Sequence, residues 1–119
     1  MIDKGQRQKA PVRAVEWLKT ASPRPPGPMY NSHNWGGYLI WALPDEPVFA
    51  DGRTDVYGEF LLDYVTVMFA RPGWQAVLDQ YHVRMALMER DSFLAAMLAT
   101  RPEWGLMYRD DQAEIWTRR

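Results

Sequence analysis

The chain contains no cysteine, which excludes disulfides and thiolate metal sites. It also lacks an apolar run that approaches the ~20 residues needed to span a bilayer. The longest candidates, 60–70 and 93–99, are short and are interrupted or bounded by polar residues. No apolar segment follows the first four residues, so no signal peptide is predicted. From these absences we expect the chain to be soluble as presented.

Neither sign of charge dominates the sequence. The formal net charge is −1, and the acidic and basic residues are scattered along the chain. Such a chain has no electrostatic field to hold a phosphate backbone, so nucleic acid is not expected as a partner. The phosphate-loop and dinucleotide glycine patterns are also missing, and no cofactor is predicted.

Histidine is scarce, with only His33 and His82. His33 follows the first predicted strand, whereas His82 precedes the third, so the two belong at opposite ends of a parallel sheet. They are therefore not expected to share a metal ion, and no metal site is predicted.

What the sequence does contain is ordinary globular composition, with 47% hydrophobic and 24% charged residues in a chain of 119. This length indicates one domain. We expect residues 1–9, which are polar, to form a flexible lead-in, and residues 10–119 to form a single α/β domain. Six tryptophans and 13% aromatic residues leave two interpretations open. The rings fill a small core, or some of them line a groove for a sugar or a lipid headgroup.

Apolar spacing and turn residues predict the elements of the chain. Helices are expected at about 12–20, 34–43 and 56–70, then around Trp74 to Tyr81 and from Phe93 to Leu98. Asn31, Ser32 or Asn34 is expected to cap the second of these, and Asp91 or Ser92 the last. Strands are predicted at 29–31, 48–50 and 83–88, and two more at 105–109 and 113–117 flank a polar turn. Asp110 and Asp111 in that turn are expected to face solvent.

Strands that alternate with helices and end in a hairpin predict an α/β fold. We expect a mixed sheet of about five strands covered by helices, with a C-terminal β-hairpin. The first three strands are expected to be parallel, joined by right-handed helical crossovers.

Polar clusters follow the first two predicted strands directly. Because the carboxyl ends of parallel strands meet at one edge of a sheet, the two clusters are expected to share that edge. The predicted ligand-binding residues are Asn31, His33, Asn34, Trp35, Asp51, Arg53, Asp55 and Tyr57.

Several roles fit the residues at this edge. Asp51 or His33 is a candidate general base and Arg53 a candidate anion clamp, which would make the chain a small enzyme for an anionic substrate. A structural role is also open, and favoured for the second cluster: Arg53 would pair with an aspartate, and Asp55 would cap the next helix. Polar groups with Trp35 or Tyr57 would suit a glycan instead. No catalytic residue is assigned.

Three segments together resemble the C-terminal ends of certain bacterial polytopic membrane proteins that look like glycosyltransferases using lipid-linked sugars. They are Asn31 to Leu43 (NSHNWGGYLIWAL), Pro47 to Tyr57 (PVFADGRTDVY) and Trp104 to Arg119 (WGLMYRDDQAEIWTRR). The resemblance covers most of the chain from about Val12 onward. Its Asn-Trp-Gly-Gly and Asp-Gly-Arg elements are distinctive together, and neither is a catalytic signature.

The resemblance implies an extramembrane domain that follows the last membrane span, on the extracytoplasmic face of a bacterial membrane when tethered. In that class of glycosyltransferase the catalytic carboxylates lie in loops of the membrane part. The favoured hypothesis is therefore a non-catalytic accessory domain of a membrane-associated protein, with a glycan or lipid-linked sugar and the membrane portion of a parent protein as partners. The small enzyme and a purely structural module are the alternatives.

Overall fold

A computed structural model describes residues 10–47, 49 and 59–119 of the chain. Its elements, in chain order, are α2 (Val12–Thr20), β1 (Met29–Asn31), the 3-10 helix η1 (His33–Trp35), α3 (Gly36–Ala42), α4 (Glu59–Met68), α5 (Trp74–Gln80), β2 (Met85–Glu89), α6 (Phe93–Leu98), β3 (Trp104–Arg109) and β4 (Ala113–Arg118). None of the described helices is long and apolar enough to cross a membrane.

Most of the predicted elements are present close to their predicted bounds. The helix predicted at 34–43 begins as η1 and continues as α3, with Ser32 as its cap, because the Ser32 hydroxyl accepts a hydrogen bond from the Asn34 N–H. Ser92 caps α6 in the same way. In the strand predicted at 48–50, Val48 and Ala50 lie outside the described residues, and Phe49 lies in a bend.

The sheet has four strands in the order β1-β2-β4-β3 within the described part of the chain. β1 and β2 are parallel, whereas β4 runs antiparallel to both β2 and β3. The mixed sheet, a parallel pair at its start and the C-terminal hairpin are thus confirmed. The strands predicted first and third are direct neighbours, with Met29 opposite Met85.

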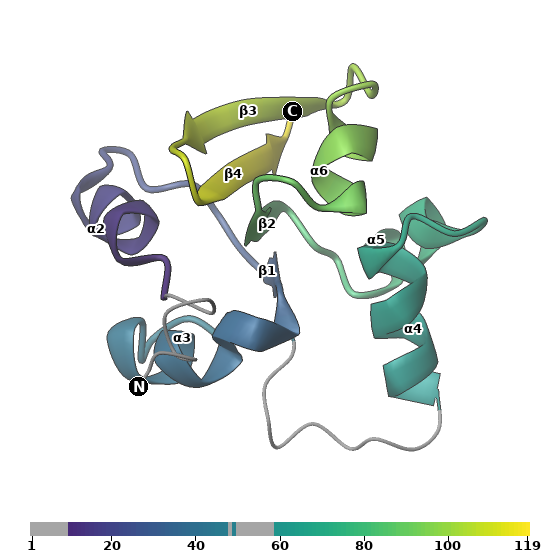
Figure 1. Cartoon of the computed structure of the whole chain (residues 1–119), viewed down its shortest axis with the longest axis horizontal. Helices are drawn as coiled ribbons and strands as arrows, with labels where there is room; N and C mark the ends of the chain where they lie inside the picture. The colour runs from purple at the N-terminus through teal and green to yellow at the C-terminus, as the bar shows by residue number, and fades with distance from the viewer. Residues whose placement is uncertain (1–9, 48, 50–58) are drawn as a thin grey trace.

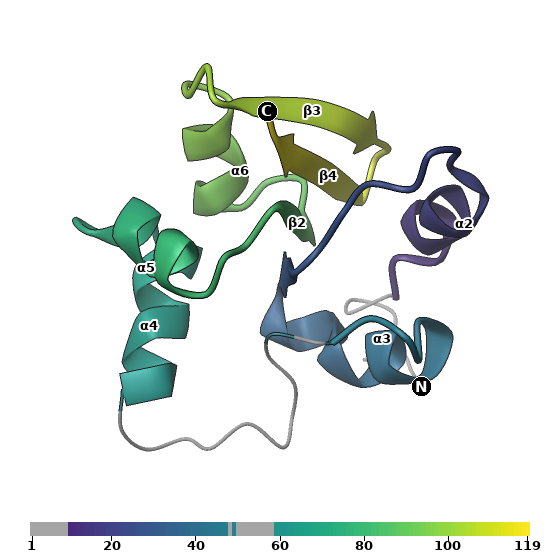
Figure 2. The same ribbon diagram turned by 180° about the vertical axis from the view of Figure 1, so that it is seen from behind.

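Helices cover both faces of this sheet. Figures 1 and 2 show α2 and α3 on one side of the strands, and α4, α5 and α6 on the other. In β2, Met85 and Leu87 face the first group, whereas Ala86 and Met88 face the second. This alternation is the period of two expected of a strand that is buried on both faces.

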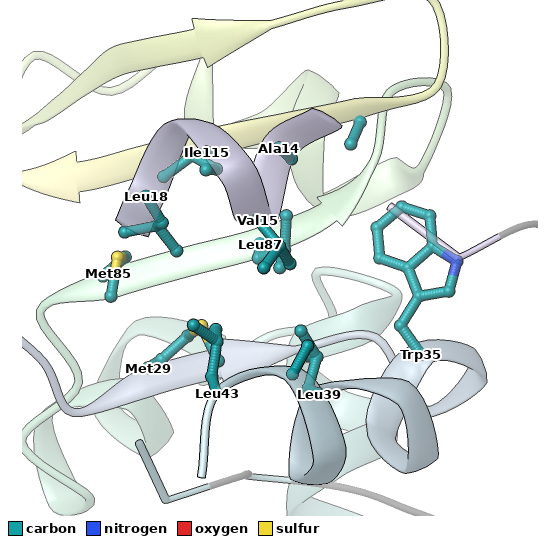
Figure 3. Packing of buried hydrophobic residues seen from close by; sticks show 12 residues of the cluster. Ala14, Val15, Leu18, Met29, Trp35, Leu39, Leu43, Met85, Leu87 and Ile115 are labelled. Carbon is teal, nitrogen blue, oxygen red and sulfur yellow. The ribbon is translucent and has the colours of Figure 1, made fainter. Parts of the chain in front are cut away.

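The core on the α2–α3 side is drawn in Figure 3, where Val15 and Leu18 of α2, together with Leu39 and Leu43, pack around side chains of β1 and β2. Trp35 belongs to this cluster and is 3% exposed. Four of the six tryptophans are buried, so the interpretation that large rings fill the core holds for most of them. Trp17 is half-buried, and Trp41 is 77% exposed.

Candidate functional site

A pocket with a volume of about 660 Å³ opens at the carboxyl edge of the parallel pair β1–β2. Open α/β sheets place ligands at this edge, because the loops that leave neighbouring parallel strands diverge there. Its lining residues come from the segments after β1 and β2 and from α4: Ser32, His33, Asn34, Leu61, Tyr64, Val65, Met68, Phe69, Glu89, Asp91, Ser92 and Phe93.

The Glu89 carboxylate organises the polar side of the pocket. Its Oε2 accepts hydrogen bonds from the Ser32 hydroxyl at 2.8 Å and from the Asn34 side-chain amide at 3.2 Å. Glu89 ends β2, and the two donors follow β1, so the parallel register brings the three side chains together. This cluster holds the loop after β1 against the end of β2. Ser32 is 2% exposed and serves as a brace rather than as a reachable nucleophile.

Tyr64 connects α4 to the same loop. Its hydroxyl accepts a hydrogen bond from the backbone N–H of His33 at 2.8 Å, and its ring stacks on Tyr30 at a centroid distance of 5.7 Å. Burial raises the pKa of Tyr64, so its hydroxyl stays protonated at neutral pH. The exposed His33 ring lies edge-on to Tyr64 at 6.1 Å.

The opposite wall is apolar and reaches solvent. Phe69, at the end of α4, is 47% exposed, and Phe93, at the start of α6, is 67% exposed. Their ring centroids lie 5.8 Å apart. Two exposed aromatic rings beside carboxylates and an amide form an amphipathic pocket.

Of the predicted ligand-binding residues, the structure places His33 and Asn34 in the pocket. Asn31 is buried: its amide donates to the Ser32 carbonyl at 2.9 Å, and its Oδ1 accepts from the Phe49 N–H at 2.7 Å. Trp35 is also buried, so its ring is not presented to a sugar. Asp51, Arg53, Asp55 and Tyr57 lie outside the described residues, and their shared edge with the first cluster stays a prediction.

The structure places His82 before β2, at the end of the sheet opposite His33. Among the described residues, no group of three or more His, Asp or Glu side chains is arranged to hold a metal ion.

Sequence reasoning did not include the carboxylates Glu89 and Asp91 or the rings Phe69 and Phe93 among the predicted ligand-binding residues. A signal for Glu89 was present in principle: it is the first charged residue after a fully buried run, Met85 to Met88. That signal points to the pocket only when β2 is known to pair with β1.

Comparison with protein-family models finds no match. Comparison with curated proteins finds none either. Among solved structures, the fold is similar to the crystal structure of the C-terminal globular domain of an oligosaccharyltransferase from Archaeoglobus fulgidus, with a TM-score of 0.67. The alignment covers 91% of this chain and 95% of that domain at 9% sequence identity. The two chains therefore share a fold over nearly their whole lengths, and the similar protein is archaeal rather than bacterial.

Proposed function

We propose that this chain is a non-catalytic accessory domain of a membrane-associated protein resembling glycosyltransferases that use lipid-linked sugars, and that it binds a neutral sugar unit in the β1–β2 pocket. The observation that carries the proposal is the end-to-end fold similarity to the C-terminal globular domain of an oligosaccharyltransferase. The resemblance that we draw from the segments Asn31 to Leu43 and Trp104 to Arg119 agrees with this proposal. The membrane portion of a parent protein is then the partner, at the extracytoplasmic face of a bacterial membrane.

The chemistry of the pocket suits a neutral sugar. Carboxylate oxygens of Glu89 and Asp91 accept hydrogen bonds from sugar hydroxyls, and the Asn34 amide can both donate and accept. The apolar face of a pyranose ring packs on exposed aromatic rings, which Phe69 and Phe93 supply. No lysine or arginine lines this pocket in the described part of the chain, so its described lining does not favour an anionic substrate.

The pocket also supports a binding role more than a catalytic one. Ser32 is buried and hydrogen-bonded to Glu89, and the His33 imidazole is paired with no described carboxylate. A hydrolytic or transfer mechanism needs a reachable nucleophile or base that a third group orients. Among the described residues Glu89 is an oriented carboxylate, but no reachable nucleophile is paired with it, and this favours recognition over catalysis.

The test is a titration of the purified chain with neutral mono- and oligosaccharides, followed by amide NMR shifts. Phe93→Ala removes an exposed ring and is expected to weaken binding roughly 2- to 12-fold, the range for one aromatic contact. Trp41→Ala is the control, because Trp41 is an exposed aromatic ring on α3 outside the pocket. Glu89→Gln is expected to weaken binding, and Glu16→Gln, exposed on α2, is its control.

Shifts that map to the pocket, together with weaker binding by Phe93→Ala but not by Trp41→Ala, support the proposal. Absence of binding to every neutral sugar at millimolar concentrations contradicts it. Equal affinities of Phe93→Ala and wild type would place the sugar elsewhere and would also reject this site.

A further inference from the structure

A second pocket, of about 390 Å³, lies at the opposite edge of the sheet, where β2 begins and β4 ends. It is lined by Asp79, His82, Val83, Arg84, Arg118 and Arg119. This lining combines three guanidinium groups with one carboxylate, in a chain whose net charge is −1. The β1–β2 pocket, by contrast, has two carboxylates and no described arginine or lysine.

The strand register is what gathers these arginines. β4 runs antiparallel to β2, so its last residues lie beside the first residues of β2, with Thr117 opposite Met85. The N–H of Arg118 donates to the carbonyl of Arg84 at 2.9 Å. Arg84, which precedes β2, and the adjacent Arg118 and Arg119 at the end of β4 thus lie together at one corner of the sheet.

One of the guanidinium groups, that of Arg118, is held in place by the fold. Arg118 lies over the ring of Trp104 at 5.1 Å and forms an ion pair with Asp79 at 2.8 Å. The guanidinium of Arg119 lies over Gly105, where a Cβ would come within 3.2 Å of Arg119 Cζ. Because Arg118 already offsets the one side-chain carboxylate of the lining, that of Asp79, the side-chain charges of Arg84 and Arg119 remain to attract an anion.

We propose that this pocket binds a phosphate group. Guanidinium groups form paired, charge-assisted hydrogen bonds to phosphate oxygens, and Arg84 and Arg119 are both exposed to receive one. A free phosphate or pyrophosphate and the phosphate headgroup of an anionic lipid offer the same chemistry. The inference does not depend on the sugar-binding role of the first pocket, which lies at the other end of β2.

Two parallel assays test the proposal on the whole chain. In one, inorganic phosphate and pyrophosphate are titrated in low-salt buffer while amide shifts are followed by NMR. In the other, the chain is co-sedimented with phosphatidylglycerol vesicles and, for comparison, with phosphatidylcholine vesicles. Arg84→Gln and Arg119→Gln are compared with wild type, and Lys19→Gln is the charge-matched control because Lys19 is exposed on α2, away from the pocket. Arg118 is left intact because its ion pair and ring contact tie it to the fold.

The expected result is binding in at least one assay, weakened about tenfold by Arg84→Gln or Arg119→Gln, as for the loss of one charge-assisted hydrogen bond in an open pocket. Added salt should weaken binding, and Lys19→Gln should match wild type. Response to soluble phosphate alone identifies a free anion as the ligand, and response to anionic vesicles alone identifies a headgroup. Binding in neither assay overturns the proposal, and so does binding that Arg84→Gln, Arg119→Gln and Lys19→Gln weaken equally. Circular dichroism and melting temperature confirm that each variant is folded.

Discussion

The Asp110 carboxylate fixes the turn between β3 and β4, and removing it should destabilise the domain. Its Oδ1 accepts hydrogen bonds from the backbone N–H groups of Gln112 at 2.7 Å and Ala113 at 2.8 Å. Its Oδ2 accepts a hydrogen bond from the Tyr108 hydroxyl at 2.6 Å. The side chain is only 8% exposed. Asp110 therefore satisfies three donors at the point where the chain reverses.

The size of the effect follows from these three bonds. A hydrogen bond to a charged group contributes about 1.5–3 kcal/mol, so a simple sum would exceed 4 kcal/mol. The sum is too large, because a turn near the surface lets water replace part of what is lost and because bonds to one carboxylate are not additive. We expect Asp110→Ala to lower the free energy of unfolding by about 3 kcal/mol. Asp110→Asn keeps one acceptor oxygen and should cost about 1 kcal/mol.

The pKa of Asp110 gives a second, independent signature. Burial alone would raise this pKa, but hydrogen bonds from Tyr108, Gln112 and Ala113 and the charge of Arg13 outweigh it, so the pKa is lowered. A carboxyl whose pKa is lower in the folded state stabilises the fold above its unfolded pKa of about 3.9. That stabilisation is lost as the pH falls through the folded pKa. The difference in stability between wild type and Asp110→Asn should therefore be constant near neutral pH and shrink below about pH 4.

The assay is urea denaturation followed by circular dichroism, at pH 7 and in acid. Asp111→Asn is the control, because Asp111 is the next residue in the same turn, is 82% exposed, and pairs with Arg13 at the surface. Exposed ion pairs contribute little, so this variant should lose less than about 1 kcal/mol. If Asp110→Asn and Asp111→Asn prove equally stable at pH 7 and follow the same acid profile, the reasoning from the three hydrogen bonds is refuted.

Three further substitutions test the fold and are read by the same denaturation measurement. Leu87→Ala, at a fully buried position in β2, should lower the free energy of unfolding by roughly 2–5 kcal/mol by creating a cavity. Ser92→Ala should cost about 1 kcal/mol, because the Ser92 hydroxyl accepts the Ala95 N–H at the start of α6. Asn31→Ala should cost about 2–4 kcal/mol by leaving the Phe49 N–H and a second buried group without their partner.

Exposed positions of the same residue types serve as controls for the Leu87 and Ser92 substitutions. Leu106→Ala on β3 and Ser22→Ala in the loop before β1 should each change the free energy of unfolding by less than about 0.5 kcal/mol. A loss at Leu106 as large as that at Leu87 would show that burial does not govern the stability of this sheet.

Local patterns predicted the elements well because each element has its own signal. The apolar spacing of α2, the short apolar run of β2 and the polar turn of the hairpin depend only on residues within one segment. Burial of individual polar or aromatic side chains has no such local signal. Asp110 was predicted to face solvent and is nearly buried, because Tyr108 and the turn amides fold over it. Trp35 was predicted to contact a ligand and instead packs in the core below β1.

Only the part of the candidate site that follows β1 could be predicted, because the rest depends on how the strands are ordered in the sheet. His33 and Asn34 were found from the segment after β1, since a polar cluster behind a short apolar run marks a strand end. The other half of the pocket comes from Glu89 and from α4, more than 25 residues further along the chain. Assigning it required knowing that β2 is the direct neighbour of β1, and strand order has no signature within either strand.

The two pockets follow from the position of β2 in the sheet. β2 is paired on both sides, so three strands or their connections meet at each of its ends. Arg84 precedes its first residue, Glu89 is its last, and every residue between them is apolar and buried. The antiparallel register then adds Arg118 at the basic end, and the parallel register adds Ser32 and Asn34 at the acidic end. A phosphate and a neutral sugar would thus be bound about one strand length apart, a separation of roughly 17–20 Å for a five-residue strand. A sugar phosphate is much smaller than that distance, so the two sites would act on separate ligands or on distant parts of one extended ligand.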